Sequence, residues 1–386
     1  MEEPPPESSD RRRLSILVVG FGTALGVTAF TYPLLALESG LSATAVGLLA
    51  SVSAALQMAS RLVLPYLLSR FLDRSLMVFA LLVMAVSAGA LLVTQALIGF
   101  VVAQVGQGFA RGVFHTASQT HAVRNPGVAS RGLAFVQTTA QFGRLIGPAV
   151  AGSLAVISLR ASLIAAVALA GAGALFAATL VAMPPYRRDP PSDRKPIWRR
   201  GDLAMAYWGG AAGGVWRGLS ESFVPVILTD RGLAPSVVGW LLSLADGAGF
   251  LTTASVARWG RDDVRPFVPL AATALAVALV LMPLASGVVL LGALMLVAGS
   301  SGGVSGVLGT AVANETVEES EQGAAITLVG TYRAGARLAA PATVSGTLSA
   351  LALPAAMACV AGAIFAPTLW FGPRHSRARR AGTVDQ

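Results

Sequence analysis

The sequence predicts an all-α integral membrane protein with 12 transmembrane helices, arranged as two pseudo-symmetric bundles of six. Three observations predict this fold class: the composition, a series of long apolar stretches, and an internal repeat. Of the 386 residues, 54% are hydrophobic and only 12% are charged, whereas a soluble domain carries roughly 25% charged residues. A water-soluble protein of this composition would expose too much apolar surface to stay dispersed, so we expect lipid as the solvent.

Twelve apolar stretches are long enough to span a bilayer, which takes about 20 residues in helical conformation. In the first half we expect spans at residues 14–37, 43–69, 75–95, 97–122, 132–158 and 162–183. In the second half we expect spans at residues 203–229, 236–257, 265–284, 287–313, 324–350 and 353–372. The first stretch is too long for a cleaved signal peptide.

Three polar segments complete the predicted domain organisation. Residues 1–13 form an N-terminal tail rich in proline and charge, which we expect to be disordered. Residues 184–202 are basic and proline-rich, and we interpret them as a linker between a bundle at 14–183 and a bundle at 203–372. Residues 373–386 form a basic C-terminal tail.

The distribution of basic residues predicts the orientation in the membrane. With the N-terminus in the cytoplasm, the tails and loops on that side hold 20 of the 28 Lys and Arg residues. The opposite side holds only Arg160 and Arg231. Cytoplasmic loops are enriched in basic residues, so we expect both termini and the linker to be cytoplasmic. Abundant Ala, Gly and Arg beside a single Lys indicate a GC-rich bacterial gene, and hence the bacterial cytoplasmic membrane.

The two halves of the chain repeat at an interval of about half its length. Pro33 matches Pro225 in an alignment of residues 32–51 with a stretch that lies 192 residues later. The segment GRLIGP at 143–148 aligns with ARLAAP at 336–341, which lies 193 residues later. A parallel repeat of six spans, with a substrate site at the repeat interface, is a transporter architecture.

The composition argues against other classes of protein. The net charge is +9, but the arginines stand in short gaps between apolar runs and form no basic stripe of the kind that binds nucleic acid. A single cysteine, Cys359, and three histidines without a HExxH spacing predict no metal site. No Walker A motif is present, and the acids within the spans are too few for a catalytic constellation. We therefore expect no cofactor and no enzymatic activity.

The fifth span carries the sequence GRLIGPAVAG, with Gly143, Gly147, Pro148 and Gly152. This sequence resembles the GxxxGPxxxG antiporter motif of the major facilitator superfamily, and the resemblance covers nearly the whole chain. The glycines permit close helix contact and the proline bends the helix. The resemblance implies a transporter of that fold, in which this region acts as hinge and seal. It favours an exporter that exchanges its substrate for protons.

The loop after the second span departs from the superfamily pattern. The superfamily's G-x-L-a-D-R-x-G-R-R is PYLLSRFLDR here, and Ser69 replaces the usual aspartate. The copy of this loop in the second half lacks the aspartate as well. The arginines that remain in the two loops are Arg70, Arg74, Arg258 and Arg261. On the fourth span, Gln104 stands where the superfamily has a proton-relay arginine, so we do not expect that relay here.

Apart from Arg265 at the first position of the ninth span, eight charged residues lie within the predicted spans. They are Arg61, Arg111, Arg144, Arg217, Arg333, Arg337, Glu221 and Asp246. Each costs at least about 2.5 kcal/mol at a helix centre that faces lipid, so we expect these residues to face a cavity or one another. The resemblance places all of them on spans that line the central cavity.

Helical spacing groups further polar residues with these charges. The predicted faces are Gln104, Gln107, Arg111 and His115 on the fourth span, Gln137, Gln141 and Arg144 on the fifth, and Arg333 and Arg337 on the eleventh. Arg217 and Glu221 are i,i+4 partners on the seventh span. Trp216 and Tyr332 are aromatic side chains beside these charges, as suits an amphiphilic ligand.

Several of these residues also have a purely structural interpretation. Arg61 lies close enough to the cytoplasmic end to snorkel, and Arg217 with Glu221 can be a structural ion pair. Arg144 and Arg337 can stabilise the bend of their helices instead of contacting substrate. Packing alone also accounts for His115, Trp216 and Tyr332.

These features together predict a secondary active transporter that works by alternating access. We expect proton-coupled export of a small organic or amphiphilic molecule, with Glu221 and Asp246 as equal candidates for the proton carrier. The charges within the spans sum to +4, which favours an anionic substrate. One alternative is an importer that symports an organic anion with protons, and another is a transport-inactive membrane sensor. We expect a monomer in the lipid bilayer, with no nucleic acid partner.

Overall fold

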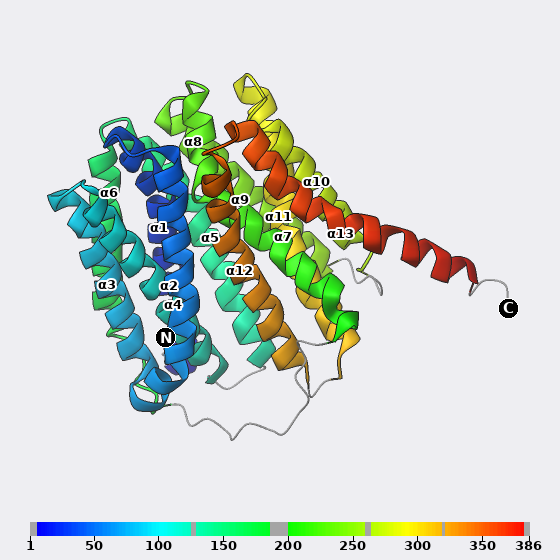
Figure 1. Cartoon of the computed structure of the whole chain (residues 1–386). Helices are drawn as coiled ribbons and strands as arrows, with labels where there is room; N and C mark the ends of the chain where they lie inside the picture. The colour runs from blue at the N-terminus through cyan, green and yellow to red at the C-terminus, as the bar shows by residue number, and fades with distance from the viewer. Residues whose placement is uncertain (1–5, 125–128, 186–199, 259–263, 319–320, 382–386) are drawn as a thin grey trace. The chain divides into compact units, whose positions relative to one another are not determined.

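The computed structural model describes residues 6–124, 129–185, 200–258, 264–318 and 321–381 (Figure 1). Within these ranges the regular structure is entirely helical, with thirteen α-helices and a short 3-10 helix at Gly201–Leu203. Each of the predicted spans corresponds to a helix or, in one case, to two helices.

The helices of the first half are α1 (Pro6–Glu38), α2 (Ala43–Arg70), α3 (Asp73–Val93), α4 (Leu97–Arg124), α5 (Ala129–Ala155) and α6 (Leu159–Ala177). The helices of the second half are α7 (Ala204–Ser220), α8 (Phe223–Asp230), α9 (Pro235–Arg258), α10 (Phe267–Leu281), α11 (Val288–Thr316), α12 (Gln322–Thr347) and α13 (Leu353–Ala381).

The seventh predicted span is broken into α7 and α8. Pro225 explains the position of the break, because proline has no N–H to donate to the carbonyl of Glu221 and its ring crowds that carbonyl. Glu221 occupies the C-cap of α7. The hydroxyl of Ser222 donates a 2.7 Å hydrogen bond to the carbonyl of Gly218 and thereby satisfies one of the carbonyls at the helix end.

Eight of the helices in the described ranges are long and apolar enough to cross a membrane, judged by length and composition. They are α1, α2, α3, α4, α6, α9, α11 and α13. Helix α10 is also apolar but has only 15 residues. Helices α5 and α12, which our prediction counted as spans, carry arginines and other polar residues of the predicted cavity and are less apolar for that reason.

The chain divides into two compact units, and the division falls at Ser192, inside the predicted linker. The first unit contains residues up to Ser192 and also Gly232–Ser243, which includes the first residues of α9. The second unit contains Asp193–Arg231 and Leu244–Gln386.

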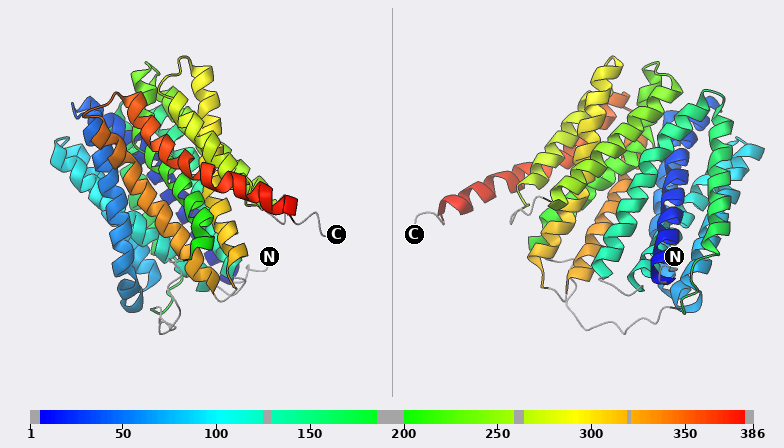
Figure 2. Two further views of the ribbon diagram at one scale, coloured as in Figure 1. Left: turned by 45° about the vertical axis from the view of Figure 1, so that its right-hand side comes forward. Right: turned by 180° about the vertical axis from the view of Figure 1, so that it is seen from behind.

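Glycines bring α1 and α5 of the first unit into close contact, and Figure 2 shows these helices side by side. A Cβ atom on Gly26 would lie 2.9 Å from the Cα atom of Gly147 and 3.0 Å from the carbonyl oxygen of Arg144. Gly143 packs in the same way against the backbone of α1 at Gly22. Two of the motif glycines therefore serve the helix contact that the sequence predicted for them.

The second unit repeats this contact between α7 and α12. A Cβ atom on Gly218 would lie 2.7 Å from the carbonyl oxygen of Arg337 and 3.1 Å from Pro341. Gly218 follows Gly26 by 192 residues, and Arg337 follows Arg144 by 193 residues. The repeat found in the sequence is thus a repeat of backbone packing.

The two ends of the chain differ from the prediction. Helix α1 begins at Pro6, so the expectation of a disordered tail at 1–13 is wrong for residues 6–13, and residues 1–5 lie outside the described ranges. The physical reason is that Asp10 is buried in contacts with other helices, which stabilise the first turns. Helix α13 continues to Ala381, beyond the predicted end of the last span at residue 372.

Candidate functional site

Four of the charged residues within the second unit form two ion pairs. The guanidinium of Arg217 on α7 donates a 2.8 Å hydrogen bond to the carboxylate of Asp246 on α9. The guanidinium of Arg337 on α12 donates to the carboxylate of Glu221, at the C-cap of α7. The side chains of Arg337 and Glu221 are only 11% and 13% exposed. The charges are therefore largely removed from the surface and partnered, as the cost of burying them requires.

This arrangement corrects the expected partnership of Arg217 with Glu221. The i,i+4 argument assumed one continuous helix, but α7 ends at Ser220, and Glu221 at its C-cap accepts a hydrogen bond from Arg337 on α12. The charge of Glu221 still acts on Arg217. Arg217 forms its ion pair with Asp246, which has no charged partner within a turn on its own helix and takes one from α7. The structure thus pairs each of the two acids that the sequence singled out with one of the predicted arginines, Asp246 with Arg217 and Glu221 with Arg337.

Arg333 and Tyr332 lie next to each other on α12 with different surroundings. The guanidinium of Arg333 donates a 2.5 Å hydrogen bond to the carbonyl of Gly306 on α11. The ring of Tyr332 is 43% exposed and stacks on Tyr207 with 4.5 Å between ring centroids. Trp216, in contrast, is only 3% exposed and lies against the backbone of Gly302, which is a packing environment.

In the first unit, the polar face of α4 is largely buried. Gln104, Gln107 and Arg111 are all less than a tenth exposed. The amide of Gln107 donates a hydrogen bond to the hydroxyl of Thr28 on α1, and its carbonyl accepts one from Ser53 on α2 at 3.5 Å. Burial and side-chain partners fix this face in place, as buried polar groups require.

His115 lies on the same face, among three arginines of the first unit. Its ring meets Phe21 edge-on at 5.6 Å between centroids. The charges of Arg144 on α5, Arg111 on α4 and Arg61 on α2 all act on this imidazole. Arg61 itself is exposed. The face of α4 and Arg144 therefore belong to one cationic group, although they come from different helices.

The motif on α5 has contacts beyond α1. Pro148 cannot donate to the carbonyl of Arg144, and the next amide, that of Ala149, donates a 2.9 Å hydrogen bond to the hydroxyl of Ser243 on α9. A Cβ atom on Gly152 would lie 2.9 Å from the Cα atom of Gly239, also on α9. On the preceding turns of α5, Gln137 is exposed and Gln141 is half-buried.

The loop arginines have partners other than a loop aspartate. The guanidinium of Arg70 lies 4.6 Å from the centre of the Tyr66 ring, a cation–π contact. The guanidinium of Arg74 donates a 3.1 Å hydrogen bond to the carbonyl of Leu180, just after α6. Arg261 and the side chain of Arg258 lie outside the described residues.

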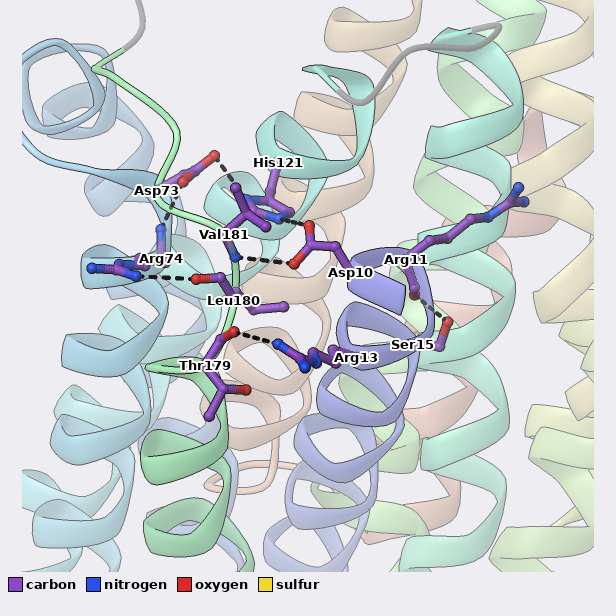
Figure 3. A network of polar contacts seen from close by, with 10 residues as sticks. All are labelled: Asp10, Arg11, Arg13, Ser15, Asp73, Arg74, His121, Thr179, Leu180 and Val181. Carbon is purple, nitrogen blue, oxygen red and sulfur yellow. Dashed lines mark hydrogen bonds and ion pairs between the residues drawn. The ribbon is translucent and has the colours of Figure 1, made fainter. Parts of the chain in front are cut away.

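Sequence reasoning missed a group of titratable residues at one end of the first unit (Figure 3). His121, near the end of α4, lies between Asp10 on α1 and Asp73 on α3. One clue was available: Asp73 and Glu38 are the only acids in residues 14–183. No spacing rule connects residues this far apart in the chain, so the sequence did not predict the group.

The fold agrees with known transporters. The chain resembles the solved structure of the nucleoside transporter NupG (14% identity, 94% of this chain and 98% of that chain covered, TM-score 0.72). It also resembles a bacterial homologue of the human lysosomal transporter Spinster (14%, 96% and 95%, TM-score 0.70). The human organic anion transporter MFSD10 is a third such structure (18%, 96% and 100%, TM-score 0.65). No protein with curated annotation matches the sequence.

A family comparison agrees with the structural ones and identifies the class of protein. The family model described as Major Facilitator Superfamily matches residues 14–341. This is well over half of the chain, and it includes the GRLIGPAVAG motif and both ion pairs of the second unit. The protein is therefore a multi-pass membrane transporter for a small-molecule substrate and not an enzyme. The chain belongs to the major facilitator superfamily.

Proposed function

We propose that this transporter couples the export of a small organic or amphiphilic molecule to the entry of protons, by alternating access. The observation that carries the proposal is the pair of acid–arginine contacts in the second unit, Arg217–Asp246 and Arg337–Glu221. The antiporter-like motif on α5 supports export over import.

Each ion pair offers a way to bind and release a proton. A carboxylate beside an arginine stays ionised, whereas a buried carboxylate that has lost its arginine binds a proton. A conformational change that separates the partners would therefore load a proton, and the return of the arginine would expel it. Asp246 and Glu221 are both placed for this role, because each is less than a sixth exposed and each has a cationic partner on another helix.

The balance of charge supports a substrate with an acidic group. From Arg74 to Arg188 the sequence contains no Asp or Glu, and the predicted spans of the first half carry Arg61, Arg111 and Arg144, so their formal charge is positive. An anion on the Arg111 and Arg144 side of the first unit would lower the cost of these buried charges. Gln104, Gln107 and His115 share that face and can contribute hydrogen bonds.

Transport in proteoliposomes with an imposed pH gradient tests the proposal. Purified protein is reconstituted and a panel of acidic, neutral and cationic compounds is loaded or supplied outside. Export by antiport requires that substrate moves against an inward proton gradient, and that a substrate gradient alone moves protons the opposite way. Movement of both in the same direction would establish the alternative, symport of an organic anion. Proton-independent binding without transport across the whole panel would instead indicate a sensor.

We further propose that both termini are cytoplasmic, in the cytoplasmic membrane of a bacterium, and that the protein acts as a monomer. The excess of basic residues in the tails and the linker supports this orientation. Single cysteines in the two tails, in a Cys359→Ala background, should react with a membrane-impermeant thiol reagent in inverted vesicles but not in intact cells. Labelling in intact cells would reverse the orientation.

A further inference from the structure

His121 lies between two aspartates in the interior of the first unit. Its Nδ1 atom is 3.0 Å from Oδ2 of Asp73, and its Nε2 atom is 2.9 Å from Oδ2 of Asp10. The side chains of His121, Asp73 and Asp10 are 0%, 1% and 3% exposed. Figure 3 shows the imidazole with one carboxylate at each of its nitrogens. These three side chains are called the histidine cluster below.

The remaining oxygens of the histidine cluster hold backbone groups. Oδ1 of Asp10 accepts a 3.0 Å hydrogen bond from the amide of Val181, and Oδ1 of Asp73 accepts one of 2.8 Å from the amide of Arg74. Two arginines bind the same segment after α6: Arg13 donates to the carbonyl of Thr179, and Arg74 donates to the carbonyl of Leu180. The cluster thus attaches residues 179–181, a few residues before the linker, to α1, α3 and α4.

Counting protons shows that this geometry needs one more than a neutral histidine supplies. A neutral imidazole has one N–H and one lone pair, so it can donate to only one of the two carboxylates. The other nitrogen would direct its lone pair at an ionised oxygen, and both atoms would be buried acceptors without a hydrogen between them. The arrangement is satisfied when a proton is added, either on the second ring nitrogen or on one carboxylate.

We propose that Asp10, His121 and Asp73 form a binding site for a single proton, and that this proton holds residues 179–181 against the first bundle. The site is occupied at low pH and loses its proton as the pH rises. Without this proton, a lone pair of the imidazole faces a carboxylate oxygen and no hydrogen lies between them. Residues 179–181 then detach from the first bundle. Figure 3 draws three further charged side chains near the site, those of Arg11 and Arg13 on α1 and of Arg74 on α3, and all three keep their charge throughout this range.

Among the described residues, the positions of the second unit that correspond to the histidine cluster hold no such site. Asp202 follows Asp10 by 192 residues, Arg265 follows Asp73 by 192, and Asn314 follows His121 by 193. Asp202 pairs with Arg200, with 47% and 36% of the two side chains exposed. The buried titratable group of the first unit is thus replaced by Asn314, Arg265 and the exposed pair of Asp202 with Arg200. The proposed dependence of segment attachment on a proton therefore belongs to the first unit. It is independent of the acids proposed to couple transport, which lie in the second unit.

Isosteric variants test the proton count. In Asp10→Asn, the amide nitrogen donates to Nε2 of His121 and the amide oxygen still accepts from Val181, so a neutral histidine satisfies the cluster. In Asp73→Asn, the amide nitrogen donates to Nδ1 of His121, and the amide oxygen still accepts from the backbone amide of Arg74. In the double variant both amides donate to a histidine with a single lone pair. In the two single variants, residues 179–181 should therefore stay attached without the extra proton. In the double variant, one amide nitrogen has no acceptor on the histidine, so the segment should be less firmly attached at every pH.

A buried reporter makes the opening measurable. Leu180 is 1% exposed, so Leu180→Cys in a Cys359→Ala background reacts with a thiol reagent only when the segment opens. The rate is measured on purified protein in detergent from pH 6 to pH 9. Because every variant carries the same cysteine, the ratio of rates to those of Asp10→Asn removes the titration of the thiol itself. We expect the ratio for the unmodified cluster to be near one at pH 6. Because opening releases one proton, the ratio should rise about tenfold per pH unit once the pH exceeds the pKa of the group that carries this proton in the open state.

Two results would overturn the proposal. One is a rate of thiol modification that depends on pH in the same way for the unmodified cluster and for Asp10→Asn. The other is a double variant whose cysteine reacts as slowly as that of the single variants. Size-exclusion profiles and melting temperatures at pH 7 establish that each variant is folded. If the double variant does not fold, the comparison of the unmodified cluster with the two single variants still decides the outcome, because those substitutions keep the four hydrogen bonds of the cluster described above.

Discussion

Glu221 accepts a hydrogen bond from Arg337, which follows it by 116 residues in the chain. Glu221 stands at the C-cap of α7, which ends at Ser220. Arg217 in turn reaches Asp246 on α9. Two ion pairs therefore connect α7 and its C-cap to both α9 and α12.

Removing one partner of the more buried ion pair should destabilise the protein. Arg337→Ala removes the cation that donates a hydrogen bond to Glu221, which is 13% exposed. Breaking a buried pair costs up to about 3–5 kcal/mol, and the charge of Arg217, which also acts on Glu221, reduces this cost. We expect a clear loss of melting temperature in detergent. Combining Arg337→Met with Glu221→Gln should recover most of the loss, because no unpaired charge is left. A double variant as unstable as Arg337→Ala would mean that the arginine acts through packing.

Neutralising the acids should uncouple transport from protons. We expect Asp246→Asn or Glu221→Gln to abolish substrate movement driven by a pH gradient, while downhill exchange of substrate continues, because a neutral amide cannot take up and release a proton. The matched control is Asp230→Asn, which removes an acid at the end of α8 that takes no part in these ion pairs. If both acid variants keep proton-driven transport in vesicles, neither residue carries the proton.

Removing an arginine of the first unit should weaken binding of anions selectively. A hydrogen bond to a charged group contributes about 1.5–3 kcal/mol, so Arg144→Ala should weaken binding of an anionic substrate by about ten- to a hundredfold. Neutral analogues of the same substrate should bind almost unchanged. Arg160→Ala, which removes an arginine next to the start of α6, serves as the control. Equal losses for anionic and neutral ligands would assign Arg144 to the structure of α5.

The glycines of the helix contact should differ sharply from glycines with open space. A Cβ atom on Gly147 would lie 2.6 Å from the Cα atom of Gly26, whereas a Cβ atom on Gly171 of α6 would meet nothing within 4 Å. Overpacking costs about 1–3 kcal/mol, so Gly147→Ala should lower the melting temperature. Gly171→Ala should leave it unchanged or raise it, because alanine favours the helix. A similar response at both positions would contradict the close contact of α1 with α5.

The ion pair outside the membrane should give a weak pH dependence of the opposite sign to the histidine cluster. The hydrogen bond from Arg200 lowers the pKa of Asp202 below its ordinary value. A lowered pKa stabilises the folded state at neutral pH, and this stabilisation is lost as the pH falls through the acidic range. Both side chains are more than a third exposed, so solvent screens the effect. Melting curves of Asp202→Asn should differ only slightly from the unmodified protein at pH 7, and less still at pH 4.

The sequence by itself determined the fold class and the superfamily. The thickness of the bilayer sets the length and apolar composition of every spanning helix. These features can therefore be recognised in the sequence without knowing which helices are neighbours. The repeat could be read for the same reason: Gly26 and Gly218 stand in equivalent positions because equivalent backbones must approach each other. The conspicuous charges within the spans were also identified, since lipid makes them costly wherever they lie.

Tertiary structure alone decided which charges meet. The partner of Asp246 lies 29 residues away and that of Glu221 lies 116 residues away, on helices whose rotation the sequence does not specify. His121 was missed because its two aspartates come from α1 and α3 and only folding brings them to the two edges of one ring. Helical periodicity fixes neighbours along one helix, whereas an ion pair or a proton site between helices depends on their packing, which is set by many weak contacts at once.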